Sequence, residues 1–172
     1  MTAPMEPLVD IIIEDERWQD LLPALAETAA QAVLADQGLD PAAFEVSLLG
    51  CDDARIAVLN AEFRGKPAPT NVLSWPAQDL APEAEGARPD LPEPFLPDER
   101  ESLGDIAIAW ETCAREAEEQ GKSLHDHVLH LIVHGILHLL GYDHIREGDA
   151  ALMEGTEVRV LDRMGISDPY ES

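Results

Sequence analysis

Residues 134–144 of the chain are HGILHLLGYDH, the end of a strongly apolar stretch that reads as one helix. His134 and His138 are four positions apart, so an α-helix places both imidazoles on one face, about 6 Å apart along its axis. Gly141 ends the helix and lets the chain reverse, so that His144 can return as a third ligand. Three neutral imidazoles suit Zn²⁺ and leave a fourth position open for water. The alternative is a group of half-buried helix histidines without a metal.

The same spacing distinguishes between kinds of metal chemistry. His-x3-His-x2-Gly-x2-His is the ligand pattern of the metzincin peptidases, in which a glutamate after the first histidine is the general base. Here that position is Gly135. The pattern therefore favours a metal site but disfavours a peptidase of this type.

The rest of the chain alternates strand and helix signals, which predicts one α+β domain over residues 1–172. Short β-branched or alternating runs predict strands at 9–13, 44–49, 71–75 and 103–110. Helical patterns, with capping residues before them and glycines after them, predict five helices at 21–36, 53–63, 111–120, 123–140 and 147–164. Ile56, Leu59 and Phe63 are expected on one face of the second helix.

Composition excludes several classes of protein. Apolar residues make up 45% of the 172 residues, so the chain is not disordered. No apolar run approaches the roughly 18 residues of a membrane span, and the first residues lack the pattern of a signal peptide. Cys51 and Cys113 do not form a CxxC pair, which fits two buried thiols in a reducing cytoplasm.

Charge is the unusual property of this chain. There are 35 Asp and Glu against 11 Lys and Arg, a formal net charge of −24, so its far field repels nucleic acids and anionic membranes. Residues 78–101 contain eight acids, two arginines and five prolines, which predicts a solvated loop inserted into the domain. Any RNA substrate would have to be held by a local patch, for which Arg64, Lys66 and Arg55 are candidates beside the metal.

Several segments together resemble one known family. LNAEFRGKPAPTNVLSWP at 59–76, LGDIAIA at 103–109, HGILHLLGYDH at 134–144, and the spacing of Met153 and Glu157 follow in order. They resemble the blocks of the YbeY family, bacterial rRNA maturation factors with zinc-dependent endoribonuclease activity. Trp75 stands where that family usually has Phe, and Pro67 stands where an acidic residue is common.

The resemblance implies a zincin-like α+β fold with a four-stranded, mostly parallel sheet. It implies one zinc ion on His134, His138 and His144, with His134 and Arg64 catalytic. The implied activity is cleavage of single-stranded RNA during maturation of the 16S rRNA 3′ end, in the cytoplasm and near the small ribosomal subunit or its associated proteins. Two other functions remain open: a ribosome-assembly factor with a structural zinc, and a metal-dependent hydrolase of another substrate, including a peptidase.

The two cations of the second block each have two interpretations. Arg64 either complements the C-terminal end of its helix or binds a phosphate bidentately and stabilises charge developing there. Lys66 either adds a charge to the same phosphate path, as a substrate-binding residue, or is a solvated loop residue. Neither choice follows from the sequence alone.

Other polar residues are expected in supporting roles. Thr70, Asn71 and Ser74 are expected to hold the loop and the strand edge by hydrogen bonds. Asp105 is expected to have a structural partner, with a place in the lining of the cleft as the alternative. Asp143 either orients His144 or caps the turn. His130 is a possible fourth ligand or a packed partner, whereas the two histidines nearest the helix start, His125 and His127, are expected to be exposed.

Overall fold

The computed structural model describes residues 7–94 and 99–170, and the described part is built around a mixed sheet. Its four strands lie in the order β1, β2, β4, β3, with bounds Val9–Ile13, Phe44–Cys51, Glu101–Ala109 and Val72–Pro76. The pairs β1/β2 and β2/β4 are parallel, whereas β3 runs antiparallel to β4 and forms an edge of the sheet. The predicted mostly parallel, four-stranded sheet is confirmed.

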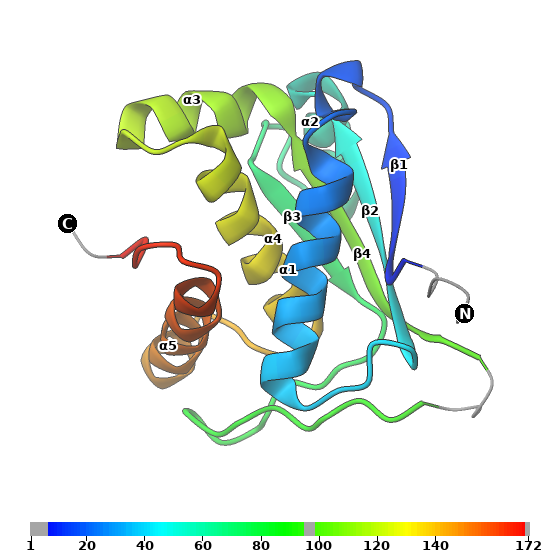
Figure 1. The fold of residues 1–172 in the computed structure, drawn as a ribbon, viewed down its shortest axis with the longest axis vertical. Coiled ribbons are helices and arrows are strands. Elements are labelled where there is room, and N and C mark those ends of the chain that lie inside the picture. Colours follow the sequence, from blue (N-terminus) through cyan, green and yellow to red (C-terminus); the bar gives the residue numbers. More distant parts are fainter. Residues whose placement is uncertain (1–6, 95–98, 171–172) are drawn as a thin grey trace, which may run out of the picture.

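Within the described residues, five α-helices surround this sheet (Figure 1). Helices α1 and α4 pack together on one face, α3 and α5 pack against α4, and α2 lies on the other face. The bounds are Leu22–Gln37 for α1, Asp53–Arg64 for α2, Trp110–Gln120 for α3, Leu124–Leu139 for α4 and Glu147–Arg163 for α5. None of the helices in the described ranges is long and apolar enough to cross a membrane.

Alternation along β4 separates the two faces of the sheet. Ile106 and Ile108 belong to the main core under α1 and α4, whereas Ala107 and Ala109 belong to a smaller cluster with Ile56 of α2. The C-terminal half of β4 is therefore buried on both faces, which explains why residues 106–109 are continuously apolar.

Helix α2 begins and ends as the sequence predicts. The Asp52 carboxylate accepts a hydrogen bond from the backbone N–H of Arg55 at 2.8 Å, and Gly65 ends the helix with a φ of 69°. Of the three apolar residues predicted on one face of this helix, Ile56 is fully buried, whereas Phe63 is 62% exposed. The last turn of α2 lies beside the edge strand β3, where less of the sheet is available to cover it.

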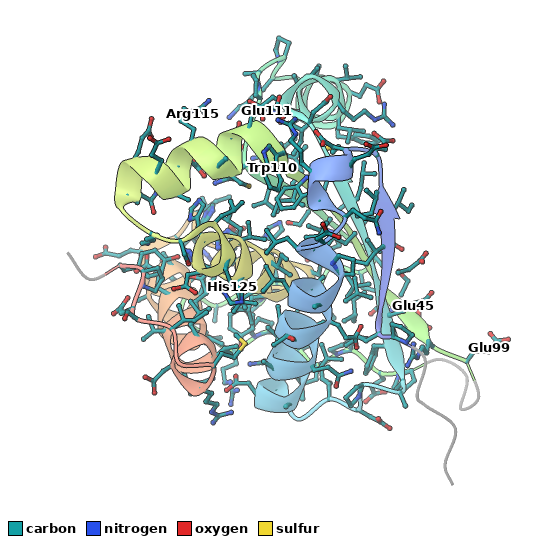
Figure 2. All side chains as sticks on the ribbon, turned by 45° about the horizontal axis from the view of Figure 1, so that its top comes forward. Glu45, Glu99, Trp110, Glu111, Arg115 and His125 are labelled. Atoms are coloured by element: carbon teal, nitrogen blue, oxygen red, sulfur yellow. The ribbon has the colours of Figure 1, made fainter. Side chains whose placement is uncertain are left out.

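A short 3-10 helix that the sequence did not predict, Glu16–Trp18, closes the top of the core. Trp18 is fully buried, donates its indole N–H to the carbonyl of Cys51 at 2.9 Å, and contacts Trp110 edge to face. Figure 2 shows Trp110 at the start of α3 beside this 3-10 helix. Cys51 and Cys113 are buried as predicted, and burial raises the pKa of the Cys51 thiol to about 12.

Asp36, at the end of α1, is held by two arginines of α5. Its side chain is 2% exposed, and its carboxylate lies 2.8 Å from Arg159 and 3.3 Å from Arg163. The hydrogen bond from Arg159 outweighs burial and lowers the pKa of this carboxyl group. The two ion pairs of Asp36 therefore join α1 to α5 by charge as well as by packing.

We expect Asp36→Asn to lower the free energy of unfolding by about 1 kcal/mol near neutral pH, because both arginines are half exposed. The folded pKa lies below the unfolded value of about 3.9. The stabilisation is therefore complete above about pH 4 and is lost as the pH falls through the folded pKa. Melting temperatures of wild type and variant, measured from neutral to acidic pH, should converge below about pH 4. The exposed Asp162→Asn is the matched control, and an equal difference at every pH would contradict the prediction.

Candidate active site

A cleft of about 570 Å³ contains most of the predicted site. One wall is formed by α4 and the loop after it, which contribute His134, His138 and His144. The other wall is formed by the edge strand β3 and by Arg64 at the end of α2. Segments far apart in the sequence thus meet at one cleft, with imidazoles on one side and a guanidinium on the other.

His134 is oriented by a buried carboxylate from α5. Its Nδ1 lies 2.5 Å from Oε1 of Glu157, which is fully buried. Burial raises the pKa of Glu157, but hydrogen bonds from His130 and His134 outweigh it and bring the pKa to about 2. A carboxylate at this position can only accept, so Nδ1 of His134 is the donor and its Nε2 keeps a free lone pair.

His138 is oriented in the same way by the backbone. Its Nδ1 donates to the carbonyl of Tyr142 at 3.1 Å, which again leaves Nε2 as the free nitrogen. Burial lowers the pKa of His138 and favours the neutral ring. Both α4 histidines therefore have an engaged Nδ1 that fixes the ring orientation, as metal-binding histidines do, and burial also favours the neutral ring of His138.

His144 reaches the cleft from the loop that follows Gly141. Its ring stacks on that of His134, with ring centroids 5.3 Å apart and the planes inclined by 28°. The Asp143 carboxylate accepts the backbone N–H of His144 at 2.7 Å but lies 3.7 Å from its ring nitrogen, so capping the turn is its main contact. Within residues 7–94 and 99–170, no group of three or more His, Cys, Asp or Glu side chains is arranged to hold a metal ion. The three imidazoles share the cleft but do not converge on a point.

The remaining histidines of α4 differ from one another. His130 lines the cleft, and its Nε2 lies 3.3 Å from the Tyr170 hydroxyl and 3.7 Å from Glu157. His125 is exposed as predicted, but the prediction for His127 is wrong, because His127 is 4% exposed. It faces α3, where its Nε2 bonds to Glu116 at 3.0 Å.

Arg64 is the best placed of the predicted cations. It is exposed, lines the cleft, and has no ion pair among the described residues. Lys66 is exposed just beyond the helix end and does not line the cleft. Arg55 is paired with Glu14 at 3.3 Å on the other end of α2 and cannot contribute.

Two predictions about β3 and β4 have opposite outcomes. Asn71 holds the start of β3 as expected: its side-chain oxygen accepts from the N–H of Val72 at 2.6 Å, and its amide donates to Glu116 at 3.0 Å. Asp105 was expected to have a structural partner, but its side chain is exposed and makes no ion pair within the described ranges. It lies opposite Trp75 in the sheet, at a position that α2 leaves uncovered.

The acidic segment between β3 and β4 contacts the loop that carries His144. Residues 77–94 and 99–100 are mostly exposed and have no strand or helix, while residues 95–98 lie outside the described part. Arg146 donates to the carbonyls of Pro82 and Glu83 at 2.9 and 2.8 Å, and Asp149 accepts from the N–H of Gly86 at 2.8 Å. The predicted solvated loop is thus also fastened to the start of α5.

Gly141 lets this segment approach the end of α4. Its φ is +102°, and a Cβ there would come within 2.7 Å of the Leu80 backbone. We expect Gly141→Ala to lower the free energy of unfolding by about 2 kcal/mol, through strain and backbone displacement. In contrast, Gly155→Ala in the middle of α5 meets no atom within 4 Å and should raise it by about 0.5–1 kcal/mol. Denaturant unfolding of both variants tests this, and equal effects would contradict it.

Sequence reasoning missed two residues that support the histidines, Glu157 and Tyr170. Glu157 had been noted only for its spacing from Met153, and Tyr170 not at all. The Tyr170 hydroxyl donates to Oε2 of Glu157, and burial raises the pKa of this tyrosine. The signal for Glu157 is its place among the buried residues Met153, Val160 and Leu161, where a carboxylate requires partners.

The fold and the cleft define an α+β protein in which oriented histidines and Arg64 line the same cleft. Comparisons with known proteins show which family has this combination. The family model described as Endoribonuclease YbeY matches residues 10–165. A protein named Endoribonuclease YbeY from Ruegeria pomeroyi is 62% identical over 94% of this chain and 97% of its own length. One of the same name from Methylocella silvestris is 46% identical over 97% of this chain and 88% of its own.

Comparison with solved structures agrees at the level of the fold. The solution structure of TM1509 from Thermotoga maritima is similar with a TM-score of 0.54 and 22% identity, and the match covers 95% of this chain and 99% of that one. The chain belongs to the YbeY endoribonuclease family. The resemblance inferred from the sequence blocks is confirmed.

Proposed function

We propose that this protein is a zinc-dependent endoribonuclease that cleaves single-stranded RNA during maturation of the 16S rRNA 3′ end in the cytoplasm. Family membership supports the reaction class. The zinc, its ligands His134, His138 and His144, and the rRNA substrate are parts of the proposal. The observation that carries the metal assignment is that Nδ1 of both His134 and His138 is engaged, so that two free Nε2 atoms belong to one cleft.

The donor set fits zinc better than harder cations. Imidazole nitrogen suits Zn²⁺, whereas Mg²⁺ and Ca²⁺ prefer oxygen ligands. Glu157 and the Tyr142 carbonyl act on the far nitrogens, as the outer partners of zinc-binding histidines do. The chemistry supplied by a bound ion would be polarisation of a phosphoryl oxygen of the RNA.

The protein's own contribution is to position and neutralise the phosphate. Arg64 faces the histidines across the cleft and has a planar fork that matches two phosphate oxygens. A guanidinium held there stabilises the charge that develops in the transition state. Its position at the end of α2, before Gly65, leaves the fork free of competing carboxylates in the described residues.

A peptidase is disfavoured by the packing around Gly135. A Cβ at this position would come within 3.2 Å of the Ile106 side chain of β4, so the glutamate base of a metzincin would require that side chain to shift. The position that would carry that base instead packs α4 on the sheet.

The proposal is tested by metal content and RNA cleavage measured on the same samples. Wild type should contain about one zinc per chain and cleave a single-stranded RNA oligonucleotide. His134→Ala should lose the metal and lower cleavage at least about 100-fold, while the exposed His125→Ala should change neither. Intact wild-type protein that binds zinc but cleaves no RNA would overturn the proposal. A large fall in melting temperature on loss of zinc would then indicate an assembly factor with a structural metal, and peptide cleavage another hydrolase.

A further inference from the structure

Beside Arg64, the cleft carries two aromatic side chains, one exposed and one half-buried, that the proposed chemistry does not use. Phe63 of α2 and Trp75 of β3 pack edge to face, with ring centroids 5.3 Å apart. Both line the cleft, and Phe63 is 62% exposed. Large aromatic side chains are rarely left in water without a partner, and on RNA-binding proteins they stack unpaired bases.

The surroundings of this pair suit a neutral base and not a phosphate. Asp105 lies directly opposite Trp75 on the neighbouring strand, on the same face of the sheet, and its carboxylate is exposed. A phosphate placed on the Trp75 side would be repelled by this charge, while Arg64, next to Phe63 in the chain, attracts one on the other side. The charges of Arg64 and Asp105 therefore favour the phosphate of a bound RNA strand on the Arg64 side and its neutral base on the Trp75 side.

The edge of β3 adds hydrogen-bonding groups beside the pair. The backbones of Asn71 and Ala77 form hydrogen bonds with β4, at Ala109 and Leu103. Backbone groups along an antiparallel strand point alternately toward and away from the neighbouring strand. Those of Ser74 therefore point toward the open edge. Ser74 lines the same cleft. Its backbone N–H and carbonyl have no partner in the described ranges and can bond the edge of a base that is not paired with another strand.

The acidity of the chain makes such a neutral contact important. Among the described residues that line the cleft, Arg64 is the only Lys or Arg, so few phosphates can be neutralised there. Stacking of one base on an aromatic side chain contributes about 1–3 kcal/mol, and it does so without added positive charge. We propose that Phe63 and Trp75 form a stacking subsite for one unpaired nucleobase, adjacent to the phosphate held by Arg64. This subsite rests on the proposed function and makes it selective for single strands.

The test compares three variants on a single-stranded RNA oligonucleotide. Phe63→Ala should raise KM about 10-fold and change kcat little, whereas Phe63→Tyr should remain close to wild type because stacking is preserved. Val58→Ala is the matched control, since Val58 is a 46% exposed apolar residue on the same helix outside the cleft. Substrates with a single abasic site, moved along the strand, give a second test. At one position the missing base should raise the KM of wild type about as much as Phe63→Ala does. The same substrate should not raise the KM of Phe63→Ala further.

A separate binding measurement keeps this inference distinct from the proposed function. Fluorescence anisotropy of a labelled single-stranded RNA in the presence of a chelator reports Kd without cleavage. The subsite predicts a Kd about 10-fold weaker for Phe63→Ala even if wild type cleaves no RNA. The subsite is overturned if Phe63→Ala has the same KM and Kd as wild type, or if Val58→Ala weakens RNA binding as much as Phe63→Ala does. Either result leaves the nuclease proposal intact.

Discussion

Arg64→Ala should lower kcat/KM for single-stranded RNA about 100-fold or more, with little change in stability. The side chain is exposed and unpaired within the described residues, so its removal breaks no internal contact. Loss of one preorganised donor to a developing charge costs about 10²–10³ in kcat, and the effect should appear in kcat more than in KM. Steady-state kinetics and the melting temperature of the same preparation measure both.

Two further variants make this experiment specific. Arg64→Lys retains the charge but not the planar fork and should recover only a small part of the activity. Arg115→Ala removes a half-exposed arginine of α3 outside the cleft and should leave kcat unchanged. If Arg115→Ala loses as much activity as Arg64→Ala, the effect reflects net charge and not the position of Arg64.

Glu157→Ala should be among the most destabilising substitutions in the chain. It leaves Nδ1–H of His134 and the Tyr170 hydroxyl without their acceptor, a carboxylate that is itself fully buried. Breaking such a buried network costs about 3 kcal/mol, which for a chain of this length lowers Tm by about 10 °C. Thermal unfolding followed by circular dichroism tests this directly.

Glu157→Gln separates the stability effect from the orientation of His134. The amide keeps the shape and one acceptor but not the charge, so we expect a smaller loss of stability and zinc affinity reduced about 10–100-fold. Glu154→Gln is the control, since Glu154 is exposed on the same helix. Unchanged zinc affinity in Glu157→Gln would mean that the carboxylate is structural and does not tune His134.

The elements of the fold were largely predictable because their signals are local. β1 has the predicted bounds, and Ser123 and Gly38 cap α4 and α1 as expected from their types. The 3-10 helix at Glu16–Trp18 was missed because it depends on Trp18 filling a gap between distant segments. The exposure of Phe63 could not be predicted, because helical periodicity does not say where the sheet beneath a helix ends.

The ligand candidates of the site came from a local spacing, whereas the residues that support them did not. The spacing of His134, His138 and His144 predicted three ligands of one metal ion. The structure places all three in one cleft, although within the described residues they are not arranged to hold an ion. The partner of His134 is on another helix, 23 residues further along the chain, and no local pattern links the two. His127 and Asp105 were assigned the wrong environments for the same reason, since exposure depends on which elements pack against them.

The bond between Tyr170 and Glu157 has a practical consequence for handling the protein. A tag placed beside Tyr170 would lie next to the support of His134. β1 lies on the opposite side of the molecule from α5 (Figure 1), so a tag placed beside β1 leaves this corner undisturbed. Preparations that differ only in where the tag is placed are therefore expected to differ in zinc content.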